Sequence, residues 1–184
     1  MKQLIVISAP SGAGKTTITK RMLEKHPNEL TFSISATTRQ MRNGERDGVD
    51  YYFLSKEDFV HKIKNNELIE YEEIFGNYYG TLVSEIDRAK VQGKSLIFDI
   101  DVKGGISIRN RFPNDSLLIF IAPPSLEVLR ERLTNRGTEN AEVIERRLAR
   151  AKMEMEMAVV YDHIVVNDNL DIATTQVESL IFSQ

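Results

Sequence analysis

Short, uninterrupted apolar runs alternate along the chain with longer segments in which apolar residues recur every three or four positions. The runs lack polar alternation, which is typical of strands buried on both faces of a parallel sheet. We expect such strands at Leu4–Ile7, Ser95–Ile100, Leu117–Ile121 and His163–Val166. The longer segments predict helices at Lys15–Lys25, Glu85–Val91, Leu126–Leu133, Ala141–Tyr161 and Ile172–Phe182. Strand followed by helix, repeatedly, predicts an α/β fold in which a doubly wound parallel sheet is flanked by helices.

The segment from about residue 32 to residue 80 follows a different pattern. It is richer in tyrosine and glutamate, and its apolar residues form short stretches such as Tyr51–Phe53 and Leu68–Tyr71. The pairs Asn43-Gly44 and Asp47-Gly48 are typical of turns. We therefore expect a small mixed α+β lobe inserted into the α/β core.

Composition and charge narrow the class of protein. The 184 residues carry a net charge of −3 and no cysteine. A weakly acidic chain has no global attraction for nucleic acid or a membrane surface, so we expect neither as a partner. No run of about 18 apolar residues is present to span a bilayer, and Leu4–Ile7 is too short for a signal peptide. The lack of cysteine fits a cytoplasmic enzyme.

The stretch SAPSGAGKTT, residues 8–17, follows the first predicted strand and is nearly the phosphate-binding pattern G-x-x-x-x-G-K-[ST]. A glycine-rich turn that leads into a helix forms a concave anion site from backbone N–H groups. Lys15 would reach the β- and γ-phosphates, and the Thr16 hydroxyl would bind Mg²⁺. Ala9 replaces the first glycine, which costs about 1–2 kcal/mol only if its φ is positive. The predicted ATP-binding residues here are Ala9, Pro10, Ser11, Gly12, Ala13, Gly14, Lys15, Thr16 and Thr17.

The loop leaves the phosphate acceptor open, because such loops serve hydrolases and kinases alike. The stretch DVKG, residues 101–104, matches the D-x-x-G of GTPases, but the guanine-reading N-K-x-D occurs nowhere in the chain. The inserted lobe favours an acceptor. Arg39, Arg42, Tyr51 and Tyr79 suit a phosphate monoester, since guanidinium groups bind its oxygens in pairs and phenols add neutral donors. Their alternative role is a solvated charged face with structural tyrosines.

Several motifs occur in one order along residues 3–182: ISAPSGAGKTT, TTRQMRNGERDGVDYYF, FGNYYGT, IFDIDVKG, IAPPS, RLTNRGTE and IVVND. In these motifs the chain resembles the guanylate kinases, which move the γ-phosphoryl group of ATP onto GMP. Bacterial members often have alanine where Ala9 stands. Lys103 departs from the family, in which glutamine is usual at that place, so its effect on the acceptor site stays open.

The resemblance implies roles for individual residues. The GMP-binding residues would be Ser35, Arg39, Arg42, Tyr51, Glu70, Tyr79, Thr81, Asp99 and Asp101, of which Ser35, Glu70 and Thr81 read guanine. Arg132, Arg136 and Arg147 would close over the ATP phosphates from a mobile lid, and together with Lys15 and Arg42 they form the predicted catalytic set. Asn167 and Asp168 fall where the family contacts the adenine region. An ionised Glu70 can accept from both N–H donors of guanine, and the Ser35 and Thr81 hydroxyls can donate to its O6.

The resemblance also implies a division of the single domain. We expect a core of residues 1–32, 85–124 and 151–184, a GMP-binding lobe of residues 33–84 and a helical lid of residues 125–150. Six arginines lie between residues 130 and 150; we expect Arg146 and Arg150 to pair with glutamates on a solvated helix face. Two alternatives stay open: a protein-binding module that keeps the fold without catalysis, and a kinase for another nucleoside monophosphate. The oligomeric state is not predicted.

Overall fold

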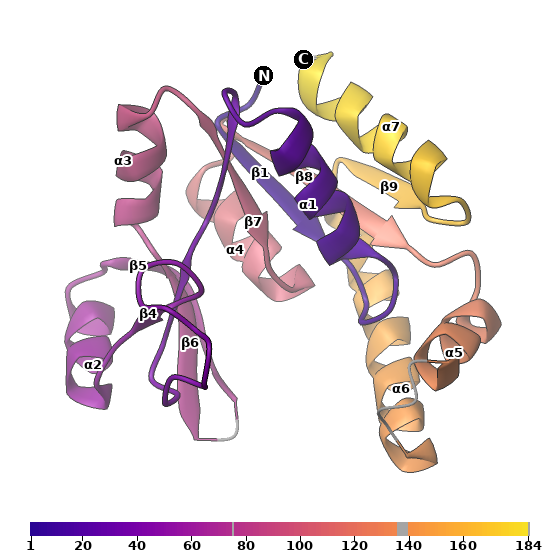
Figure 1. The fold of residues 1–184 in the computed structure, drawn as a ribbon, viewed down its shortest axis with the longest axis horizontal. Helices are drawn as coiled ribbons and strands as arrows, with labels where there is room; N and C mark the ends of the chain where they lie inside the picture. Colours follow the sequence, from indigo (N-terminus) through magenta and orange to yellow (C-terminus); the bar gives the residue numbers. More distant parts are fainter. Residues whose placement is uncertain (75, 136–139, 184) are drawn as a thin grey trace.

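The computed structural model describes residues 1–74, 76–135 and 140–183, and within them the chain forms two sheets (Figure 1). The larger has five strands in the order β2-β7-β1-β8-β9, all parallel to their neighbours. Its strands are β1 (Leu4–Ser8), β2 (Leu30–Phe32), β7 (Ser95–Asp99), β8 (Ser116–Ala122) and β9 (His163–Val166). The predicted parallel α/β fold is therefore confirmed.

The smaller sheet has four strands in the order β4-β3-β6-β5 and lies between β2 and β7 in the sequence. Its strands are β3 (Ser35–Thr37), β4 (Tyr52–Phe53), β5 (Leu68–Ile74) and β6 (Asn77–Leu82). The β3-β6 and β5-β6 pairs are antiparallel and β3-β4 is parallel, so the sheet is mixed. With α2 (Lys56–Lys64) it has its own apolar cluster around Phe59.

Helices cover both faces of the larger sheet because alternate residues of β1 point to opposite sides. Ile5 and Ile7 pack with α1 (Lys15–Lys25) and α7 (Leu170–Phe182). Leu4 and Val6 pack with α3 (Ser84–Val91), α4 (Val102–Arg111) and the 3₁₀ turn η1 (Ala158–Val160). Helices α5 (Leu126–Asn135) and α6 (Ala141–Met157) share a separate cluster and extend beyond the sheet (Figure 1). Among the described residues no helix is long and apolar enough to cross a membrane.

The sequence prediction missed the helices α2 and α4 and did not single out the strands β2, β3 and β6, and it extended another helix too far. In α4 the pattern is obscured by Gly104 and Gly105, each about 1 kcal/mol less favourable in a helix than alanine. Gly105 is required because a Cβ there would lie 2.0 Å from the Tyr161 hydroxyl oxygen. Short α2 and β2 gave too few periodic positions to be recognised. The helix predicted for 141–161 ends at Met157, because Tyr161 turns inward with extended backbone and donates to Ser8 Oγ at 2.8 Å.

Gly80 in β6 provides a test of how closely the smaller sheet is packed. A Cβ at this position would lie 2.6 Å from the backbone oxygen of Glu70 and 2.9 Å from the Cβ of Tyr71. Since a strand backbone cannot move aside without loss of its ladder, Gly80→Ala should lower the free energy of unfolding by about 1–3 kcal/mol. The urea midpoint measured by circular dichroism checks this. An unchanged midpoint would contradict the close approach of β5 and β6.

Candidate active site

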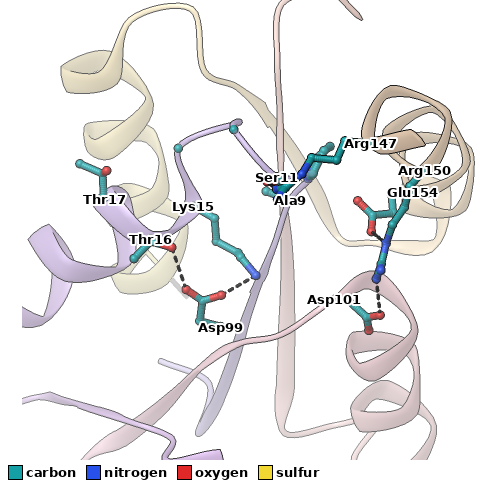
Figure 2. Close-up of a pocket in the computed structure, with 13 residues that line it drawn as sticks. Ala9, Ser11, Lys15, Thr16, Thr17, Asp99, Asp101, Arg147, Arg150 and Glu154 are labelled. Carbon is teal, nitrogen blue, oxygen red and sulfur yellow. Dashed lines mark hydrogen bonds and ion pairs between the residues drawn. The ribbon is translucent and has the colours of Figure 1, made fainter. Parts of the chain in front are cut away.

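A pocket of about 550 Å³ lies where β1 and β7 of the larger sheet end (Figure 2). Both strands are parallel neighbours, so their carboxyl ends open at the same edge of the sheet. The pocket is lined by Ala9, Pro10, Ser11, Gly12, Gly14, Lys15, Thr16, Thr17, Asp99, Asp101, Arg147, Arg150 and Glu154. All predicted ATP-binding residues of the loop except Ala13 line it, together with carboxylates and arginines from distant segments.

The backbone of the loop explains its glycines. Gly12 and Gly14 have φ of 94° and 96°, in the left-handed region that glycine adopts most readily. Among the described residues the only non-glycine residue with positive φ is Asn66, so Ala9 carries no such strain. Its methyl group instead belongs to the apolar core on one face of the sheet. The departure of Ala9 from the phosphate-binding pattern is therefore harmless to the backbone. Ala13 is fully buried in the same apolar cluster.

Asp99, at the end of β7, holds the two polar side chains that begin α1. Its carboxylate forms an ion pair with Lys15 and accepts a hydrogen bond of 3.3 Å from Thr16 Oγ1 (Figure 2). Lys15 Nζ also donates to the backbone oxygen of Ile100 at 3.2 Å. The structure thus places Asp99, which we predicted among the GMP-binding residues, directly against the loop. Burial raises the pKa of Tyr51, the charge of Arg39 opposes this effect, and the charge of Asp99 adds a smaller one.

Asn167 braces the loop from behind. The residue is 4% exposed, and its Nδ2 donates to the backbone oxygen of Ala13 at 2.8 Å. A Cβ on Gly14 would lie 2.3 Å from that Nδ2, which explains the second glycine. The backbone oxygen of Asn167 accepts a hydrogen bond of 2.9 Å from Arg132. Asn167 thus contacts the loop and does not line the pocket, while Asp168 is exposed; their contact with adenine stays a prediction.

Helix α6 brings two arginines to the pocket. Arg147 donates to the Ser11 hydroxyl, as befits its predicted position over the loop. Arg150 pairs with Glu154 at 2.8 Å, as we predicted, but it also reaches Asp101 Oδ2 at 3.3 Å (Figure 2). The prediction that Arg150 only pairs with a glutamate on a solvated helix face is therefore wrong. The signal for it was present, because residues three apart share a helix face and Arg147 was already placed at the loop.

Two further arginines of the predicted lid are Arg146 and Arg136. Arg146 is exposed, in keeping with its predicted place on the solvated face. Arg136 lies outside the described residues, so its predicted catalytic role is a prediction only.

Three predicted base-reading residues form one row across the smaller sheet. Ser35 of β3 lies opposite Thr81 of β6, which in turn lies opposite Glu70 of β5. Thr81 Oγ1 donates to Glu70 Oε1 at 2.7 Å. Burial raises the pKa of Glu70; the Thr81 hydrogen bond opposes this, and the charge of Asp101 adds to it. Because a hydroxyl has one proton, Thr81 cannot donate to another acceptor while it serves Glu70, which leaves Ser35 as the donor for the predicted contact with guanine O6.

The predicted phosphate-binding residues also lie together. The Arg39 guanidinium carbon lies 5.5 Å from the centre of the Tyr51 ring, whose centre lies 6.3 Å from that of Tyr79. Glu45, which the sequence did not single out, accepts from both terminal nitrogens of Arg39 at 3.1 and 2.7 Å. It also accepts from the backbone N–H of Arg42 at 2.7 Å, while the Arg42 residue is exposed. No spacing rule marks a carboxylate six residues from its arginine in a loop.

Comparison with known proteins identifies the family of the chain. The guanylate kinase family model matches residues 1–184. The guanylate kinases of Chlorobium luteolum and Chlorobium chlorochromatii are 50% and 52% identical, over 95% and 97% of this chain and 88% and 94% of theirs. The crystal structure of guanylate kinase from Anaplasma phagocytophilum matches with a TM-score of 0.75 and 30% identity, over 99% of this chain and 85% of that one. The chain therefore belongs to the guanylate kinase family.

Proposed function

We propose that this chain transfers the γ-phosphoryl group of ATP to GMP, giving ADP and GDP. The observation that carries the proposal is the convergence of two different sites: a phosphate loop with Lys15 on the larger sheet, and the Ser35–Thr81–Glu70 row on the smaller one. Asp101 joins them, since it lines the loop pocket and, together with Glu70, a second pocket of about 420 Å³. Release of ADP from ATP, measured with GMP, AMP, CMP and UMP as acceptors, tests the proposal against both a non-catalytic module and another monophosphate kinase.

On the ATP side, the loop N–H groups and Lys15 bind and orient the phosphates. Phosphoryl transfer needs little covalent chemistry from the protein and much positioning and charge neutralisation. Lys15 is held at the pocket by Asp99, and Arg147 is held by Ser11 at the far side of the loop. Arg132, anchored on the backbone of Asn167, lies beside the same loop. These cations stabilise the negative charge that spreads over the transferred group.

Mg²⁺ accompanies ATP in this proposal, and the residues present suit it. Mg²⁺ keeps several waters and takes few protein ligands beside the substrate phosphates. Thr16 follows Lys15 in the first turn of α1, and its hydroxyl oxygen lies 3.3 Å from Asp99 Oδ2. Two oxygen atoms of this kind are the ligands that a hard cation prefers. Bound there, the ion would offset phosphate charge. The part of the chain that the structure describes holds no group of three or more His, Cys, Asp or Glu residues for a metal.

On the GMP side, phosphate and base are held by different residues of the same sheet. Arg39, Tyr51 and Tyr79 supply a cation and two phenols for the phosphate, with Arg42 exposed beside them. An ionised Glu70 accepts from the two N–H donors of guanine, and Ser35 donates to O6. Adenine would place an acceptor against the carboxylate. Closure of the lobe and lid would exclude water, so that transfer to GMP prevails over hydrolysis.

Four further points complete the proposal. The D-x-x-G stretch does not support a GTPase, because Asp101 accepts from Gly104 N–H at 2.9 Å and caps α4. ATP and GMP are the expected partners, without a nucleic-acid polymer or a membrane. The cytoplasmic location and the division into core, lobe and lid stay predictions.

Lys15 tests the ATP side. Lys15→Met removes a cation that stabilises the transition state more than bound ATP, so turnover should fall by about 10²-fold or more. Steady-state kinetics measure this, with folding checked by circular dichroism. Lys20→Met, an exposed change on the same helix, is the control and should retain turnover. A folded Lys15→Met enzyme with near-normal turnover would refute the loop assignment.

Arg39 tests the grip on the GMP phosphate. Arg39→Lys keeps the charge but loses the two-nitrogen contact with Glu45 and the planar group beside Tyr51. We expect the KM for GMP to rise about tenfold, while ATP binding measured without GMP stays unchanged. Arg46→Lys in the same exposed loop is the matched control. Equal weakening of both substrates would place Arg39 outside the GMP site.

Glu70 tests which base is read. Wild-type kcat/KM should favour GMP over AMP by roughly 10³-fold, since a mismatched base leaves buried polar groups unpaired. Glu70→Gln replaces an acceptor by a competing donor and should reduce that selectivity by about 1.5–3 kcal/mol. The exposed Glu73→Gln on the same strand is the control. If AMP matches GMP in the wild type, the guanine assignment is wrong even where kinase activity is present.

The pH profile gives an independent check on Glu70. Burial raises its pKa above the ordinary value of 4.5, so protonation should begin at a higher pH than for an exposed glutamate. The kcat/KM for GMP should therefore fall on acidification at a pH above that value, as the acceptor carboxylate takes up a proton. Glu70→Gln should lose this acidic limb. An acidic limb that persists unchanged in Glu70→Gln would assign it to another group.

A further inference from the structure

Glu85, in the first turn of α3, is a carboxylate that none of the roles above uses. Its residue is 1% exposed, and it does not line the loop pocket. Four hydrogen bonds converge on its two oxygens. Oε2 accepts from Ile34 N and Arg88 Nη2, both at 2.7 Å, and Oε1 accepts from Tyr52 Oη at 2.9 Å and Arg88 Nε at 3.0 Å. A buried charge is tolerated only where it is paired in this way.

Two of these donors adjoin predicted GMP-binding residues in the sequence. Ile34 directly precedes Ser35, the first residue of β3 and the donor for the predicted contact with guanine O6. Tyr52 directly follows Tyr51, which lies beside Arg39 in the phosphate-binding group. One carboxylate therefore fixes the backbone next to the base-reading row and the strand next to the phosphate-binding group.

Arg88 extends the same cluster to the larger sheet. Its Nη1 donates to Thr31 Oγ1 at 3.2 Å and its Nη2 to the backbone oxygen of Phe32 at 2.5 Å, both in β2. The chain passes between the sheets twice, at residues 33–34 and at residue 83, which precedes α3. The Glu85–Arg88 pair, on the helix that follows the second crossing, thus holds both ends of the first: Arg88 contacts the end of β2, and Glu85 contacts the residue before β3.

We propose that Glu85 is a positioning residue for GMP, which holds Ser35 and Tyr51 in place through Ile34 and Tyr52. The inference rests on the proposed function, because it assigns a role toward the GMP of that same reaction. Glu85 lies on α3 and does not line the loop pocket. Its loss should therefore weaken GMP binding without changing the loop that binds ATP.

The experiment compares three variants of the full chain. Glu85→Gln keeps the size of the side chain but turns an amide donor toward the donors of Arg88, and Tyr52→Phe removes a single hydroxyl. Asp87→Asn is the matched control, an exposed change on the same helix. The measurements are kcat, the KM for GMP, and the Kd of GMP and of ATP, each titrated alone by calorimetry.

We expect Glu85→Gln to raise the KM and Kd for GMP about tenfold and Tyr52→Phe about threefold. The kcat at saturating GMP and the Kd of ATP should stay within about twofold of wild type, and Asp87→Asn should match wild type. A merely structural role would instead lower the folded fraction, and with it kcat, at unchanged KM. Unchanged GMP affinity in either folded variant, or equal loss for ATP, overturns the inference.

Tyr52→Phe keeps the Arg88 and Ile34 contacts, so it decides the outcome should Glu85→Gln fail to fold. The two proposals also fail in different ways. A wild-type chain that neither binds nor phosphorylates GMP overturns the proposed function and this inference with it. A wild-type chain that phosphorylates GMP, with variants of unaltered GMP affinity, overturns the inference alone.

Discussion

The parallel pairing of β1 with β7 is the constraint from which the phosphate site follows. Ile7 lies opposite Asp99 in this ladder, so the loop after β1 and the carboxylate at the end of β7 emerge at one edge of the sheet. The Lys15–Asp99 ion pair is a consequence of that register. Ser8, the last residue of β1, adds a second contact with the segment that follows β7, because its Oγ donates to the backbone oxygen of Asp101 at 3.2 Å. A slip of one residue would turn Asp99 to the opposite face of the sheet and leave Lys15 without it.

Carboxylates of the chain itself pair with cations of the two predicted sites before any phosphate binds. Lys15 is paired with Asp99, Arg150 with Asp101 and Glu154, and Arg39 with Glu45. Without such partners, clustered cations would repel one another and adopt many rotamers, which binding would then have to order. A phosphate must therefore compete with a carboxylate for each guanidinium or ammonium group. Ligands with several negative charges compete best, which favours a triphosphate and a monoester over singly charged anions.

The parts of the fold that could be predicted are those that depend on local pattern. The strand of residues 4–8 and the loop after it are recognisable because burial on both faces and the glycine spacing are properties of adjacent residues. The helix at 102–111 was missed because Gly104 and Gly105 are required by close contacts with residues that are distant in the sequence, such as Tyr161. The same holds in the site. The roles of Asn167 and Glu45 depend on which segments the fold brings together, and spacing along the chain does not contain that information.

In the proposed function, base recognition depends on the smaller sheet and on helix α4 at once. Glu70 belongs to β5 of the smaller sheet, whereas Asp101 caps α4 of the core. A Cβ on Gly104, in the first turn of α4, would lie 3.5 Å from Glu70 Oε2, so the backbone of the helix packs closely against this carboxylate. Under the proposal, a guanine that engages Glu70 lies against α4 as well as the smaller sheet, because Glu70 and Gly104 line one pocket. A base with the wrong donors would then leave polar groups of both elements unpaired, which is how such a site rejects it.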